Sequence, residues 1–132
     1  MTRVNVVPPS ELCNKHLMAE YREMPRLVGS LKKTLNRKGK PFCESEISDE
    51  YKLGTGHVKF FYNKFKWLHD RHINITSELL KRGFNISNTD SNLFLRVDSK
   101  WYNDYCPTFN SLEINRKRIK DRMPSNPRWE VK

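Results

Sequence analysis

The chain has 132 residues with 25 Lys and Arg against 15 Asp and Glu, which gives a formal net charge of +10 and a pI near 9.7. This length allows a single domain over residues 1–132 with a modest core and excludes two domains. The charge is typical of a protein that binds a polyanion, nucleic acid first, and no apolar run approaches the roughly 20 residues of a membrane-spanning helix.

The chain begins with Met1 and Thr2, and a small second residue allows the initiator methionine to be removed. Removal would leave an α-amine on Thr2, beside the guanidinium of Arg3. An α-amine has an ordinary pKa of about 7.7 to 8.0, so part of it is neutral and nucleophilic at physiological pH. Most Met-Thr starts are only processing sites, so the dipeptide alone does not predict catalysis.

A first helix is predicted from Ser10, a suitable N-cap, to Leu35. Pro25 lies inside this pattern and lacks a backbone donor, so we expect a kink there. The apolar residues recur at alternating spacings of four and three and define a core face: Leu17, Tyr21, Met24, Val28, Leu31 and Leu35.

A second apolar stripe runs from Val58 to Leu79 and predicts a long helix that ends at Lys81-Arg82-Gly83, where cations and a glycine suit a C-terminus. A third, shorter helix is predicted from Ser111 to Met123. Strands are not signalled. The sequence therefore predicts an all-α fold, a compact single domain of three main helices with long connecting loops.

The first helix carries the candidate chemistry. At 100° per residue, its basic residues Lys15, Arg22, Arg26 and Lys33 point directly away from the core. His16, Glu20 and Glu23 fall on the flank between the two faces. A carboxylate there could act as a catalytic acid or base beside bound phosphates. The pattern alone favours a simpler interpretation, in which both glutamates only form local ion pairs with neighbouring cations.

The three cysteines, Cys13, Cys43 and Cys106, are odd in number and lack the paired spacing of a metal site. The Cys13-x-x-His16 spacing is too weak a pattern to predict zinc. We interpret all three as free thiols in a reducing compartment and expect no metal and no cofactor.

Several ordered blocks resemble the pyrimidine-dimer DNA glycosylases, the family of the phage endonuclease V type. The resemblance is nearly continuous over residues 1–86 and returns weakly around Arg118, Arg122 and Pro127-x-Trp129. Its blocks are residues 1–5, 10–12, 16–23, 25–26, 54–62 and 80–86.

The resemblance implies a bifunctional DNA glycosylase and abasic-site lyase. Such an enzyme excises cyclobutane pyrimidine dimers formed by ultraviolet light and then cleaves the strand by β-elimination. Thr2 matches the family's amine nucleophile, which forms a Schiff base with the sugar, and Glu23 matches its catalytic acid and base. The resemblance assigns the other matched residues to binding the DNA: Arg3, His16, Arg22, Arg26, Arg118 and Arg122. His72 matches a polar position near a flipped base, although it also lies on the apolar stripe.

The resemblance implies that the partner is damaged double-stranded DNA, that the protein binds it as a monomer, and that no membrane is involved. The location implied is intracellular, on DNA, in the host cytoplasm or nucleus if a virus encodes the chain. The tail after Pro127 holds one aromatic residue, Trp129, where family members commonly have several, so the dimer specificity is less securely implied than the lyase. Two alternatives remain: the same chemistry on a ring-opened purine or a bare abasic site, and a DNA-binding module without turnover.

Overall fold

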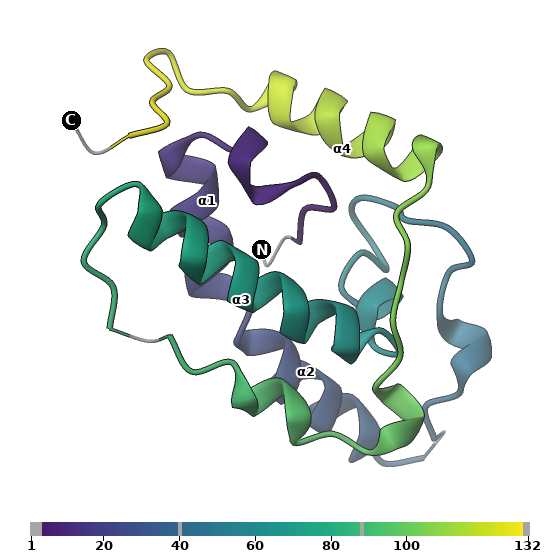
Figure 1. The fold of residues 1–132 in the computed structure, drawn as a ribbon. Helices are drawn as coiled ribbons and strands as arrows, with labels where there is room; N and C mark the ends of the chain where they lie inside the picture. The colour runs from purple at the N-terminus through teal and green to yellow at the C-terminus, as the bar shows by residue number, and fades with distance from the viewer. Residues whose placement is uncertain (1–3, 40, 88, 131–132) are drawn as a thin grey trace.

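The computed structural model describes residues 4–39, 41–87 and 89–130, and the regular structure within these ranges is helical. This confirms the all-α prediction. Figure 1 shows α1, α2 and α3 packed together, with α4 crossing above them and the first described residues running between α4 and the other helices. The α-helices are α1 (Asn14–Glu23), α2 (Arg26–Leu35), α3 (Phe65–Lys81) and α4 (Phe109–Asp121), and short 3₁₀ turns include η1 (Pro9–Glu11), η3 (Lys59–Phe61) and η4 (Asn92–Leu95).

The first predicted helix is divided at Pro25 into α1 and α2, so the expected kink is confirmed. Pro25 keeps helical dihedrals (φ −59°, ψ −22°) but has no N–H to donate. Leu27 N–H bonds the carbonyl of Met24, three residues back, at 3.1 Å, which is a 3₁₀-type bond at the junction. The break places Glu23 at the last position of α1 and Arg26 at the first of α2.

The predicted start of this helix at Ser10 is wrong. Ser10 lies in the turn η1, and α1 begins at Asn14. Leu12 (ψ 136°) and Cys13 (ψ 164°) are extended, and both side chains are fully buried. Placing these two apolar side chains in the core requires an extended backbone here, which delays the helix.

The second predicted helix starts later than its apolar stripe. Val58 and Phe61 belong to the turn η3 and its flank, and α3 begins at Phe65 after a non-helical Lys64 (φ −128°, ψ 37°). The C-terminus is as predicted: Gly83 has φ 97°, which favours glycine, and a Schellman pair of bonds closes the helix. In it, Phe84 N–H bonds Leu79 O and Gly83 N–H bonds Leu80 O, both at 3.0 Å.

The third predicted helix, α4, is found two residues earlier than predicted at each end. Its N-cap is Thr108, whose hydroxyl accepts the N–H of Ser111 at 3.0 Å. Within the described ranges, no helix is both long enough and apolar enough to cross a lipid bilayer.

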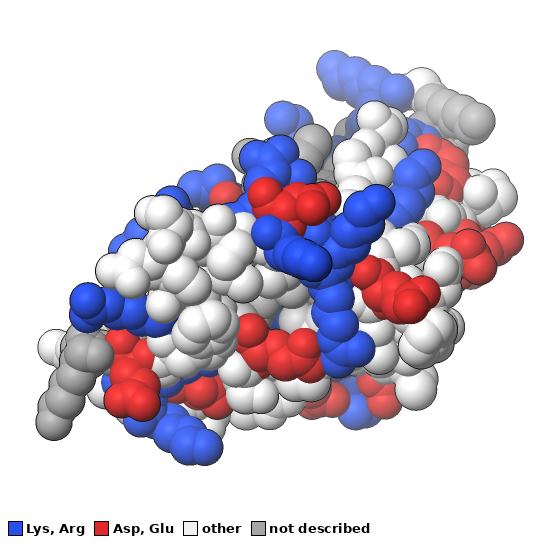
Figure 2. Space-filling model, turned by 90° about the horizontal axis from the view of Figure 1, so that it is seen from above, with Lys and Arg blue, Asp and Glu red and all other residues white. Residues whose placement is uncertain are grey.

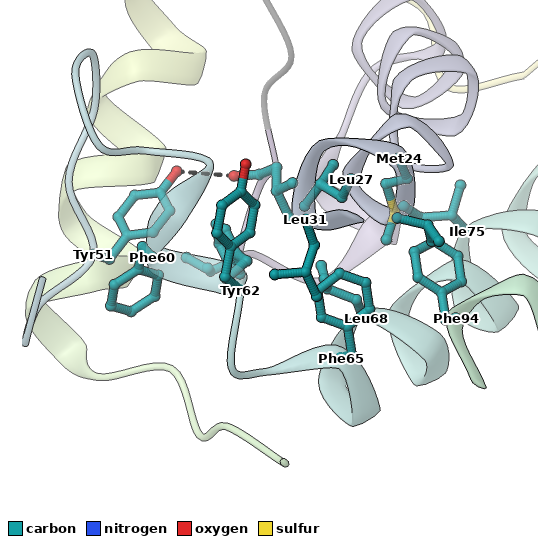
Figure 3. Close-up of a cluster of buried hydrophobic side chains, with 14 of the residues drawn as sticks. Met24, Leu27, Leu31, Tyr51, Phe60, Tyr62, Phe65, Leu68, Ile75 and Phe94 are labelled. Carbon is teal, nitrogen blue, oxygen red and sulfur yellow. Dashed lines mark hydrogen bonds between the residues drawn. The ribbon is translucent and has the colours of Figure 1, made fainter. Parts of the chain in front are cut away.

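The buried apolar side chains form one cluster between α1, α2 and α3. Figure 3 shows Met24, Leu27 and Leu31 facing Phe65, Leu68 and Ile75, with the aromatic residues Tyr51, Phe60, Tyr62 and Phe94 around them. The Tyr51 hydroxyl donates to the carbonyl of Val4 at 3.1 Å, which fixes the start of the described chain to this cluster.

His72 lies inside the same core with no exposed surface, and this corrects the expectation that it faces a flipped base. Its Nδ1 lies 2.6 Å from the hydroxyl of Ser91, and its ring packs against Phe94 at 5.3 Å between centroids. Burial lowers the pKa of His72 below its ordinary value, so the imidazole is held neutral.

Candidate active site

A cleft of about 330 Å³ lies between α1 and α4. One face of α1 lines it at helical spacing, because positions 16, 19, 20 and 23 share a side of the helix. Asn5 of the N-terminal segment also lines the cleft, as does Ile119 of α4. Four residues predicted for the site meet here: His16 and Glu23 from α1, Arg118 from α4, and Arg122, which caps the C-terminus of α4.

Glu23 is half-buried at the last position of α1, just before the break at Pro25. It is the last residue of the α1 face that lines the cleft. The other glutamate of the flank, Glu20, behaves differently: only 2 % of it is exposed, and it forms an ion pair with Arg71 of α3. The interpretation of Glu20 as a member of a local ion pair on its own helix is therefore wrong.

The cleft contains two buried nitrogen atoms that have no hydrogen-bond partner among the described residues. One is Nδ1 of His16, whose Nε2 donates to the carbonyl of Arg122 at 3.0 Å. The other is Nε of Arg118. Buried polar atoms are normally paired, so the unpaired guanidinium nitrogen of a residue that lines the cleft favours a site that accepts an anionic ligand.

Two further predicted arginines, Arg22 and Arg26, are not among the described residues that line the cleft. Arg22 and Arg26 are exposed on the outer side of the first two helices, as the angular pattern predicted. Thr2 and Arg3 lie outside the described residues. Seen from above α4, Lys and Arg form a band across the surface with acidic side chains among them (Figure 2).

Part of the basic charge on α4 is already paired. Arg116 donates to both carboxylate oxygens of Glu11, at 3.0 and 2.7 Å, away from the cleft. This ion pair gives Arg116 a structural partner. The other two arginines, Arg118 and Arg122, line the cleft.

The sequence pattern missed the residues that hold the cleft together, namely Asn5, Arg71 and Asn115. A signal for two of them was present. Arg71 falls between Leu68 and Ile75 on the core stripe of α3, and Asn115 falls between apolar residues on α4. A polar side chain on a core stripe has to find a buried partner, which marks a network rather than a surface position.

A family model described as pyrimidine dimer DNA glycosylase matches residues 1–92. The matched part contains the N-terminal segment, α1, α2 and α3, whereas α4 with Arg118 and Arg122 follows it. The match spans more than half of the chain and includes the helix that carries Glu23. The chain therefore belongs to the pyrimidine dimer DNA glycosylase family, whose members are DNA-repair enzymes that act on damaged DNA.

Proposed function

We propose that this protein excises ultraviolet-induced pyrimidine dimers and then cleaves the abasic product by β-elimination. The nucleophile is the α-amine of Thr2 after removal of Met1, and Glu23 is the acid and base. The observation that carries this proposal is the cleft, which gathers Glu23, His16 and two arginines from distant parts of the chain.

The position of the N-terminal segment supports Thr2 in this role. Val4 is held by His57, whose Nε2 accepts the Val4 N–H at 2.9 Å, and Asn5 lines the cleft. Two residues of any chain span at most about 7 Å, so an amine on Thr2 is within reach of the same cleft.

The reaction needs an amine and a carboxylate at one sugar. The amine attacks C1′ as the glycosidic bond breaks, and the departing base takes up a proton. The C1′–O4′ bond of the resulting aminated sugar then opens, O4′ takes up a proton, and the nitrogen becomes a protonated imine. This imine acidifies the C2′ proton, and removal of that proton expels the 3′ phosphate. A carboxylate stabilises the oxocarbenium-like sugar in the first step and accepts the proton in the second.

The lesion is tested with matched duplexes that differ only at one position: a cyclobutane dimer, a ring-opened purine, or an abasic site. We expect cleavage of one glycosidic bond and of the strand at the dimer, with the detached pyrimidine still joined to its neighbour through the cyclobutane ring. We also expect cleavage at the abasic site and an intact ring-opened duplex. Cleavage of the abasic duplex alone would remove the dimer from the proposal. Binding of all three without cleavage would make the protein a binding module.

Phosphate contacts are tested by salt dependence. We expect Arg22→Ala, Arg26→Ala and Arg118→Ala each to lower the slope of log affinity against log salt by about one on damaged and undamaged duplexes, because each removes one phosphate contact. Arg116→Ala is the matched control, since Arg116 is paired with Glu11 and should leave the slope unchanged. If all four variants keep the wild-type slope, the DNA binds to another face.

A further inference from the structure

Four polar residues from different elements form a buried network that reaches the cleft through Asn5 and Glu20: Asn5, Glu20, Arg71 and Asn115, which are 6, 2, 5 and 0 % exposed. Arg71 donates to Glu20 through Nε and through Nη2, the latter at 3.0 Å from Oε1. Asn5 Nδ2 donates to Glu20 Oε1 at 2.7 Å, and Asn115 Nδ2 donates to Asn5 Oδ1 at 2.8 Å. We call these four residues the amide relay.

The relay ends on the backbone of the N-terminal segment. Asn115 Oδ1 accepts the N–H of Val6 at 2.7 Å and that of Val7 at 3.1 Å. Arg71 Nη1 donates to the carbonyl of Val7 at 2.8 Å, which closes the network. Consecutive backbone groups of this segment are therefore held by side chains from α3 and α4.

The direction of every hydrogen bond in the relay follows from the charge at one end. The carboxylate of Glu20 can only accept, so the amide of Asn5 must turn its Nδ2 toward it. The Oδ1 of Asn5 then faces Asn115 and requires a donor there. Asn115 consequently presents its own oxygen to the two backbone N–H groups, which is the orientation that holds the segment.

We propose that the amide relay consists of positioning residues that fix the N-terminal segment, from Asn5 to Val7, relative to the helix that carries Glu23, and that the amine of Thr2 depends on this anchoring to react. The proposal rests on the function proposed above and names what orients its nucleophile. Asn5 follows Thr2 by three residues, Glu20 precedes Glu23 by one helical turn, and Asn115 precedes Arg118 by one turn. The relay thus fixes, relative to one another, the three elements that supply the site.

The test reverses the direction of the hydrogen bonds that Asn5 makes in the relay. Asn115→Asp keeps the shape and still accepts from the two backbone N–H groups, but its second oxygen faces the oxygen of Asn5. Asn5 cannot turn, because it would then present that oxygen to Glu20. Adding Glu20→Gln supplies a donor at position 20, so Asn5 can turn and donate to the new carboxylate, and the net charge is restored. The recovery is partial, because Arg71 Nη2 then faces an amide nitrogen.

Three quantities are measured on each variant: hydrogen exchange of the Val6 and Val7 amides, affinity for an abasic duplex, and the rate of borohydride-trapped complex formation at saturating duplex. We expect Asn115→Asp to speed exchange and to slow trapping by about 10²-fold, the cost of a displacement near 1 Å at a reacting centre, while affinity changes by less than about threefold. The double variant should trap at least about tenfold faster than Asn115→Asp, because the two sites are coupled.

Ser91→Ala is the control for lost stability alone. It removes another buried hydrogen bond, that with His72, and Ser91 does not line the cleft. It should destabilise the fold while leaving trapping unchanged. If Asn115→Asp does not fold, Asn115→Ala, which removes the acceptor without adding charge, is measured with the same expectations for exchange and trapping.

The outcomes separate the positioning role from the function. Trapping by Asn115→Asp at the wild-type rate, or unchanged exchange at Val6 and Val7, would overturn the positioning role and leave the lyase intact. If the trapping rate of the double variant falls by as much as those of its two single variants combined, the proposed direction of the hydrogen bonds in the relay is wrong. A wild-type protein that forms no trapped complex would overturn the proposed function, and the relay proposal with it.

Discussion

Blocking the amino terminus of the processed protein, by acetylation or by retention of Met1, is expected to abolish the complex that borohydride traps with abasic duplex DNA. Borohydride reduces an imine to a stable amine, so trapping reports a Schiff base directly. An acetylated nitrogen cannot form one, and a retained Met1 moves the free amine one residue away from the position proposed for the nucleophile. We expect the loss to exceed 10²-fold, since the nucleophile itself is removed, and the measurement is the yield of cross-linked protein on a denaturing gel.

The control for this experiment is Lys64, the described lysine whose pKa is lowered by burial, to about 8. Its ammonium group lies 3.9 Å from the centre of the Phe60 ring and donates to the Phe60 carbonyl at 2.8 Å, outside the cleft. Lys64→Arg should therefore trap as the wild type does. Trapping that survives a blocked amino terminus and disappears in Lys64→Arg would make a lysine the nucleophile and contradict the assignment of Thr2.

Glu23→Gln is expected to lower turnover by a factor of about 10² to 10⁴ while affinity for damaged duplex stays within about tenfold. The substitution keeps the size and the hydrogen-bonding capacity of the side chain but removes the charge and the base. Both the stabilisation of the sugar cation and the removal of the C2′ proton are lost together. Single-turnover cleavage and equilibrium binding on the same duplex separate the two effects.

A second glutamate provides the matched control. Glu113→Gln makes the same change of charge at an exposed position of α4 that does not line the cleft. It should leave turnover unchanged and strengthen binding slightly through the added net positive charge. Equal losses of affinity and turnover in Glu23→Gln, accompanied by a lower unfolding free energy, would make Glu23 a structural residue.

The sequence predicted the elements whose limits depend on local chemistry. Pro25 divides the first helix because it lacks an N–H, and Gly83 ends α3 because its φ of 97° favours a residue without Cβ. The predicted starts at Ser10 and Val58 failed for the opposite reason. Both depend on where tertiary packing buries apolar side chains, and an apolar period continues through 3₁₀ turns and extended residues alike.

The candidate site shows the same division. His16 and Glu23 could be placed on one flank of α1 because the helical period relates nearby positions. The partner of Glu20 could not, because Arg71 is 51 residues away and only the packing of α1 on α3 joins them. The burial of His72 likewise depends on Ser91 and Phe94. They follow His72 by 19 and 22 residues, beyond the end of α3, where the sequence has no periodic pattern.

The bond between Val6 and Asn115 joins positions 109 residues apart, and this separation sets an order of events during synthesis. At about 5 to 20 residues per second, the N-terminal segment waits roughly 5 to 20 s before α4 has been made. Until then its backbone amides have no partner from that helix. The N-terminal segment and the wall of the cleft that α4 supplies therefore come together only after α4 has been made, so a shorter nascent chain carries the proposed nucleophile without the structure that would aim it at DNA.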